Sequence, residues 1–244
     1  MTVRCPDTGI VAAIATQFCQ WIFMPTIKML TREKRMRFSK RQFGWALMAL
    51  SAVIIGFVAV TPSLRFNADL SRIPLNKAFV SHFLWLALHA IPSSLALIIG
   101  PFQFVPSLRS RWPRAHRYAG RLYLACVIAG SIAAIAATRM STAGFATQLG
   151  FSLLIFGWLY SAYHAYRSAR ERRFVDHRIW MIRNYAFTFA AVWLRIFLLM
   201  GIAFRHLGSA IPFDQIYTAS AWASILVSSV LAEWFLVPRV KRSA

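Results

Sequence analysis

Acidic residues and cysteines are both scarce in this sequence. Its 244 residues contain only seven Asp and Glu, against 28 Lys and Arg, and three cysteines. Three scattered cysteines exclude a small domain held together by disulfides. Charged residues make up 14 % of the chain, whereas soluble domains carry about 25 %. A soluble fold of this composition would expose a large apolar surface, so an ordinary soluble domain is excluded as well.

The short motifs of several common chemistries are also missing. The sequence has no Cys-x-x-Cys-His, His-Glu-x-x-His, Gly-x-Ser-x-Gly, P-loop or Gly-x-Gly-x-x-Gly. The sequence therefore lacks the motifs usually required for covalent haem attachment, zinc proteolysis, serine hydrolysis and nucleotide hydrolysis. Cys5, Cys19 and Cys126 are too far apart in sequence to indicate an iron–sulfur site.

Hydrophobic residues, by contrast, make up 58 % of the chain, and the mean hydropathy is +0.53. They gather in six runs, each close to the roughly 20 residues that cross a bilayer core of about 30 Å as a helix. The sequence therefore predicts an all-α fold, a polytopic transmembrane bundle of six helices. The predicted spans are Phe43–Val60, Phe79–Phe104, Tyr118–Thr138, Ala146–Tyr166, Ile179–Phe204 and Ile216–Val237.

Small residues are concentrated in the third run. Alanines recur there at intervals of four, at Ala125, Ala129, Ala133 and Ala137. In lipid, small residues at this spacing let helix backbones approach closely. The third run is therefore predicted to be a central packing helix.

Lys and Arg are concentrated in alternate loops. Twenty-two of the 28 lie before the first run, between the second and third, between the fourth and fifth, or after the sixth, when Arg121 and Arg183 just inside the flanking runs are included. Because the cytoplasmic side of a membrane protein keeps the positive charge, both termini are expected in the cytoplasm. The basic clusters are expected to contact anionic lipid headgroups. Their confinement to turns between spans excludes nucleic acid as an expected partner.

The chain is expected to divide into three parts. These are an N-terminal basic segment (1–42), the six-helix transmembrane domain (43–238) and a basic cytoplasmic tail (239–244). Within the first part, Ile10–Met24 is apolar but short for a span, and it is expected to lie in the membrane interface or to be poorly ordered. The alternatives are a seventh span, a signal-like segment, or a translation start at Met36.

Two ionisable residues lie well inside predicted spans, where such groups are costly and mark candidate functional positions. His89 lies in the second run, close to Pro92. It is either hydrogen-bonded to the carbonyl that Pro92 frees or to a hydroxyl, or it is an axial ligand or proton-handling group. Arg195 lies in the fifth run and either snorkels to the outer headgroups or pairs with a buried anion, such as a cofactor propionate.

Three further histidines mark the cytoplasmic ends of neighbouring spans. They are His116, His164 and His177, and Asp176 precedes His177. Histidines on facing helices can bind haem iron axially, although they also occur simply as polar residues at helix ends. His116 and His177 are the candidate metal ligands, and His89, His164 and Arg195 are further candidates for holding a cofactor.

Several segments between about Val80 and Phe197 together resemble the bacterial predicted membrane proteins of domain-of-unknown-function family 2306. The segments are Leu88–His89, Gly100–Phe104, His116–Tyr123, His177–Ala186 and Arg195. The resemblance covers about half of the chain. It implies a polytopic protein of a bacterial inner membrane and carries no particular activity.

The chain is also similar, more distantly, to the six-helix di-haem cytochromes b of the ascorbate-reducing type. Those proteins carry histidines on four consecutive central helices, which here would be His89, His116, His164 and His177. Their ligands pair the second helix with the fourth and the third helix with the fifth. The resemblance therefore implies pairs of His89 with His164 and of His116 with His177. His89 and His164 lie at different depths, separated by about 15–20 Å at 1.5 Å per residue. At most one bis-histidine haem b is therefore implied.

Two functions from different classes follow from these features. The first is membrane electron transfer through a b-type haem held by His116 and His177. In that case Arg121, Arg178 and Arg183 are expected near the haem propionates.

The second is a non-enzymatic carrier of a small molecule or of protons, or a membrane assembly factor. Its polar path through the bundle would be lined by His89, Asn184 and Arg195.

Overall fold

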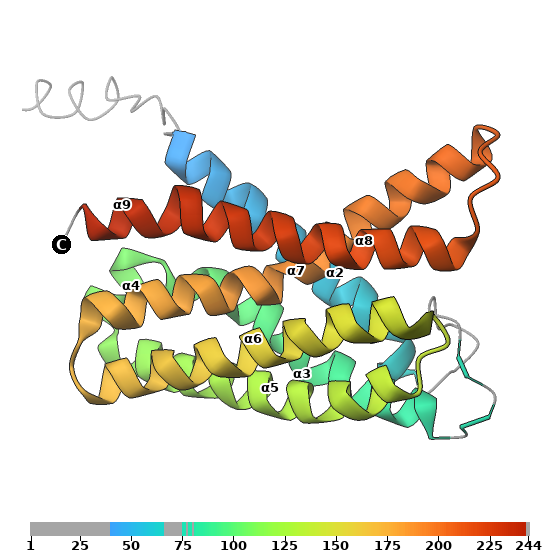
Figure 1. Ribbon diagram of the computed structural model, residues 1–244. Coiled ribbons are helices and arrows are strands. Elements are labelled where there is room, and N and C mark those ends of the chain that lie inside the picture. The colour runs from blue at the N-terminus through green and yellow to red at the C-terminus, as the bar shows by residue number, and fades with distance from the viewer. Residues whose placement is uncertain (1–39, 66–74, 77, 80, 243–244) are drawn as a thin grey trace, which may run out of the picture. The chain divides into compact units, whose positions relative to one another are not determined.

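A computed structural model describes residues 40–65, 75–76, 78–79 and 81–242 (Figure 1). Contacts divide the chain into two units, Met1–Phe43 and Gly44–Ala244, and the second holds all the features discussed below. The apolar segment Ile10–Met24 and the possible start at Met36 lie outside the described residues.

The described part of the chain is helical, and it contains six helices long and apolar enough to cross a membrane. This confirms the predicted all-α fold and its six spans. The helices are α2 (Lys40–Leu64), α3 (His82–Gln103), α4 (Pro106–Arg111), α5 (Pro113–Arg139), α6 (Gly144–Arg170), α7 (Phe174–His206), α8 (Phe213–Val230), the π-helical η2 (Leu231–Leu236) and α9 (Val237–Lys241). The sixth span runs from α8 through η2 into α9.

The apolar side chains of these helices explain why they belong in lipid. Large hydrophobic residues such as Phe57 and Phe156 are 61 % and 67 % exposed on the bundle surface. In water such a surface would drive aggregation, whereas in a bilayer it contacts the apolar lipid tails. The helical backbone satisfies its own hydrogen bonds, which is the condition for crossing the hydrocarbon region.

Four of the helices form a ring. Helix α3 packs against α5 and α7, and α6 packs against the same two helices, so α5 and α7 lie diagonally across the ring. Helix α8 covers α6 and α7, and α2 packs on α3 and α7 through Ala52, Leu97 and Val192. The arrangement places α4, the α6–α7 turn and α9 at one end of the unit (Figure 1). This end is named the arginine-rich end.

Helix α5 is a packing helix, as the sequence predicts, but its contact face is rotated from the alanine repeat. Ala133 and Ala137 are buried, whereas Ala125 and Ala129 are exposed. The face continues instead through Gly130, where a Cβ atom would lie 2.5 Å from Ser93 Oγ of α3. Close approach of α3 and α5 therefore depends on a glycine at this position.

Gly100 of α3 provides the sharpest test of this packing. A Cβ atom at Gly100 would lie 2.0 Å from Cε2 of Tyr185, whose hydroxyl donates to the Leu97 carbonyl at 3.2 Å. Because that ring is held in a packed core, we expect Gly100→Ala to lower the free energy of unfolding by about 1–3 kcal/mol, as overpacking does. Thermal unfolding of the detergent-solubilised protein measures the effect.

The matched control is Gly44→Ala, where no described atom lies within 4 Å of the added methyl group. Alanine is the better helix former, so this variant is expected to be as stable as the parent or slightly more stable. Equal stability of the two variants would contradict the packing of α3 against Tyr185.

Candidate functional site

His116 and His177 occupy equivalent positions on the diagonal helices α5 and α7. Each is the fourth residue of its helix, and its backbone N–H closes the first turn onto the residue before the helix. His116 donates to the Trp112 carbonyl at 3.1 Å and His177 to the Arg173 carbonyl at 2.9 Å. Both histidines therefore lie at the arginine-rich end.

A hydrogen bond across the ring fixes the two histidines relative to one another. The Tyr123 hydroxyl of α5 donates to Asn184 Oδ1 of α7 at 2.7 Å. Each histidine comes seven residues earlier on its own helix, which is about 10.5 Å and two turns. Since α5 and α7 run in the same direction, His116 and His177 lie at the same level and on the faces that meet across the ring. Their rings are within electrostatic reach of each other.

The imidazole of His177 is oriented by the backbone of a neighbouring helix. Its Nδ1 lies 2.8 Å from the Ala165 carbonyl of α6, so Nδ1 carries the proton and Nε2 has the free lone pair. Asp176, which the sequence places beside this histidine, is instead bonded to Arg173. A carbonyl, and not the neighbouring carboxylate, therefore sets the tautomer of His177.

Three more polar atoms near His116 and His177 are buried without a hydrogen-bond partner among the described residues. These atoms are Nε2 and Oε1 of Gln103 and Oγ of Ser168. Nδ1 of His116 is likewise buried and without a hydrogen-bond partner. Gln103 ends α3 and lies against α5, where a Cβ at Gly120 would be 3.4 Å from its Oε1. Ser168 lies on α6, one turn beyond Ala165.

Each helix of the ring therefore contributes one polar side chain near the arginine-rich end: Gln103, His116, Ser168 and His177. These four residues are named the end cluster. Buried polar atoms in proteins are nearly always paired, so unpaired ones indicate a place where water or a ligand completes the hydrogen bonds. No three His, Cys, Asp or Glu side chains of the described residues come together as a metal cage, and the end cluster supplies two histidines.

The turn that leads into α7 is strongly basic and internally paired. Glu171 accepts hydrogen bonds from Arg167 Nε at 2.7 Å and from Arg173 Nη2 at 2.6 Å. The hydrogen bonds from Arg167, and then from Arg173, hold the pKa of the Glu171 carboxyl below its usual range. This carboxylate therefore stays ionised at mildly acidic pH, where it remains paired with both arginines.

His164 does not join the end cluster. Its ring stacks on Trp180 of α7 with the centroids 4.6 Å apart and contacts Tyr160 at 4.4 Å. The sequence places His164 at the same end as His116 and His177, but the rotation of α6 turns it toward a different face of α7. Of the four candidate histidines, only His116 and His177 are brought together.

His89 and Arg195 form a separate group toward the other end of the bundle. His89 Nδ1 lies 2.9 Å from the Gly130 carbonyl of α5, and the Ser93 hydroxyl is 3.3 Å away. The carbonyl partner is therefore on another helix and is not the one that Pro92 frees. Arg195 donates to the Ala191 carbonyl at 2.8 Å and interacts electrostatically with His89. It lies 18 residues beyond His177, about 27 Å along α7, so it does not serve the end cluster.

Asn184, a candidate for a polar path, is instead enclosed in a buried network. Its Nδ2 donates to the Trp158 carbonyl at 2.7 Å and to Ser161 Oγ at 2.9 Å, while its Oδ1 accepts from Tyr123. Trp158 Nε1 and Tyr123 both contact the Thr188 hydroxyl. Asn184 is fully buried, and its hydrogen bonds hold α5, α6 and α7 together.

Sequence reasoning missed Gln103 and Ser168 as parts of the site. Gln103 lies within the Gly100–Phe104 segment, where a polar residue stands between two phenylalanines near the end of a span. That contrast is a usable signal. Ser168 carries no comparable signal, because serines are common in these helices.

A family model for predicted membrane proteins, DUF2306, matches residues 86–236. The match runs from the first turns of α3 to the end of η2 and includes the whole end cluster. No curated protein and no solved structure matches the chain. The matched region covers more than half of the sequence, and this chain therefore belongs to the DUF2306 family of predicted membrane proteins.

Proposed function

We propose that this multi-pass membrane protein binds one b-type haem at the end cluster, with His116 and His177 as axial ligands, and transfers single electrons through it. The observation that carries the proposal is the placement of two histidines at one level on diagonal helices, set by the bond between Tyr123 and Asn184. Bis-histidine haem sites in helical bundles use ligands from facing helices in this way.

The surroundings of the histidines support the proposal. A metal-ligating histidine typically donates its second ring nitrogen to a carbonyl or carboxylate, and His177 has this partner in Ala165. The unpaired amide of Gln103 can donate to a carboxylate, and Arg109 lies within electrostatic reach of His116. Both groups would suit the propionates of a bound haem.

Each part of the chain has a definite role in this proposal. Bound haem supplies a one-electron couple, tuned by its ligands and by burial. His116 and His177 hold the iron, the Ala165 carbonyl fixes the His177 tautomer, and the buried network above them keeps the two helices in register. His89 and His164 lie apart from the end cluster, so the proposal involves a single haem.

The visible spectrum of the detergent-purified protein, expressed in haem-replete cells, tests this function. We expect a Soret band, and we expect His116→Ala and His177→Ala each to remove most of it, because each variant deletes one of two ligands. His164→Ala is the matched control, since this histidine lies at the same end but stacks on Trp180, and it should keep the band.

Size-exclusion profiles of the three variants show whether each one is folded. A folded parent protein without a Soret band, or a band unaffected by both ligand substitutions, would rule out the haem site.

We further propose that the arginine-rich end faces the cytoplasm of a bacterial cell and contacts anionic headgroups of the inner membrane. The support is the concentration of Lys and Arg in the loops at that end, which follows the positive-inside rule. Both chain termini are then cytoplasmic.

Cysteine labelling of intact cells tests this orientation. With the three native cysteines replaced, Ser110→Cys lies in the exposed helix α4 and Leu207→Cys lies at the other end, where Leu207 is 83 % exposed. A membrane-impermeant maleimide is expected to label Leu207→Cys in intact cells and Ser110→Cys only after lysis. The reverse pattern would invert the topology.

A further inference from the structure

A cavity of about 360 Å³ lies between α6, α7, α8 and the η2 segment, on a different face of α7 from the end cluster. Its volume falls within the roughly 300–1,000 Å³ of small-molecule sites. Tyr160 at its rim is 47 % exposed, so the cavity opens on the outer surface of the bundle. That surface belongs to membrane-spanning segments, and a ligand therefore reaches the cavity from the bilayer.

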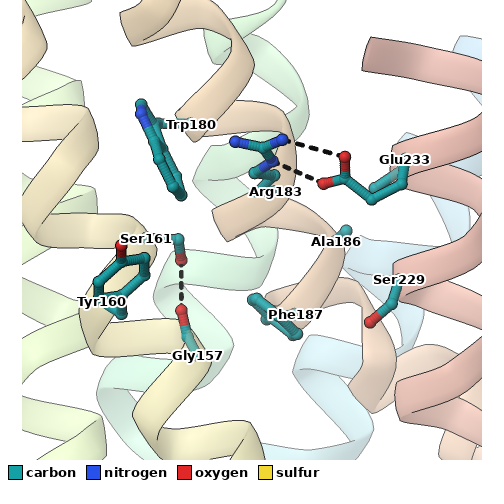
Figure 2. A pocket seen from close by; sticks show the side chains of 10 residues that line it. Gly157, Tyr160, Ser161, Trp180, Arg183, Ala186, Phe187, Ser229 and Glu233 are labelled. Atoms are coloured by element: carbon teal, nitrogen blue, oxygen red, sulfur yellow. Dashed lines mark hydrogen bonds and ion pairs between the residues drawn. The ribbon is translucent and has the colours of Figure 1, made fainter. Parts of the chain in front are cut away.

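An ion pair forms the charged part of the cavity (Figure 2). Arg183 donates from Nε to Glu233 Oε1 at 2.6 Å and from Nη2 to Oε2 at 3.0 Å. The pair is bidentate and has no net charge, so it does not select an anion. A guanidinium has five N–H donors and the carboxylate takes two of them, so the group can also donate to an oxygen of a ligand.

Aromatic rings form the walls of the cavity. Trp180 lies over the Arg183 guanidinium at 4.5 Å, and Tyr160 and Phe187 line the remaining sides (Figure 2). Gly157 is required there, because a Cβ atom would lie 2.9 Å from the Phe187 ring. The lining therefore combines aromatic rings with the ion pair and with the hydroxyls of Ser161 and Ser229.

The backbone around Glu233 departs from the regular α-helix. Leu231–Leu236 is π-helical within the last span. Such segments are rare and occur frequently at functional sites, because the extra residue re-aims the side chains around it. Here the π-helical segment carries both Glu233 and Ala232, which line the cavity.

We propose that this cavity binds the ring of a lipid-soluble quinone. The ring is planar, which suits a cavity lined by the rings of Tyr160 and Phe187, and neutral, which suits the uncharged ion pair. Its carbonyl oxygens accept hydrogen bonds of the kind Arg183 can donate. A fatty acid or an anionic lipid headgroup fits less well, because Glu233 already neutralises the charge of Arg183.

Quinone binding goes beyond the proposed haem and does not depend on it. The two sites use different faces of α7, and binding is measurable without a redox step. His116→Ala is therefore expected to bind quinone as the parent does. Loss of the haem function would leave the quinone proposal standing, and the reverse also holds.

Calorimetric titration of the full chain in phosphatidylcholine nanodiscs with a decyl-tailed benzoquinone tests the site. Ser229→Phe fills the cavity from α8, and we expect it to weaken binding at least tenfold. The matched control is Ala219→Phe, which adds the same ring at an exposed position of α8 outside the cavity, and it should bind as the parent does. Equal affinity of the two variants would overturn the proposal.

A second arm tests the role of the neutral pair, using decanoate as an anionic probe of similar length. The parent protein is expected to bind the benzoquinone more tightly than decanoate. Glu233→Gln leaves the positive charge of Arg183 without its carboxylate partner. In this variant the ratio of decanoate affinity to benzoquinone affinity should rise at least tenfold. A parent that prefers decanoate would assign the cavity to fatty acids or lipid headgroups and would overturn the quinone proposal.

Discussion

The hydrogen bond between Tyr123 and Asn184 is the contact on which the arrangement of this bundle depends. It joins α5 and α7, which face each other diagonally, and both side chains are essentially fully buried. In lipid no hydrophobic force drives helix association, so packing and interhelical hydrogen bonds decide how helices are rotated. Because Thr188 and Trp158 belong to the same network, α6 is included in this constraint.

The position of the end cluster follows from that constraint. Seven residues correspond to nearly two full turns, so whatever aligns Tyr123 with Asn184 also aligns His116 with His177. The network is fully paired, whereas the polar atoms of Gln103, Ser168 and His116 are not. The difference separates a polar group that holds helices together from one that is available to a ligand.

Helix α7 contributes to both proposed sites because its period of 3.6 residues presents two faces. His177 and Asn184 face the interior of the ring, while Trp180, Arg183 and Phe187 follow at intervals of three and four residues along the cavity. Arg183 lies only six residues beyond His177, about 9 Å along the axis. It was expected near haem propionates, but its bond to Glu233 places it in the cavity. The two sites therefore lie at similar depths but on different faces of α7.

The sequence by itself determined the six spans, the all-α class and the end of the bundle at which the basic residues gather, because hydropathy and charge act locally along the chain. It also offered His116 and His177 as a pair, through a resemblance. Only the tertiary structure decided that these two lie at one level and within electrostatic reach while His164 stacks on Trp180, and that buried, unpaired atoms of Gln103 and Ser168 lie near the same end. The physical reason is helix rotation. The depth of a residue can be counted along the sequence, but the face it presents depends on contacts between distant helices, such as that of Tyr123 with Asn184.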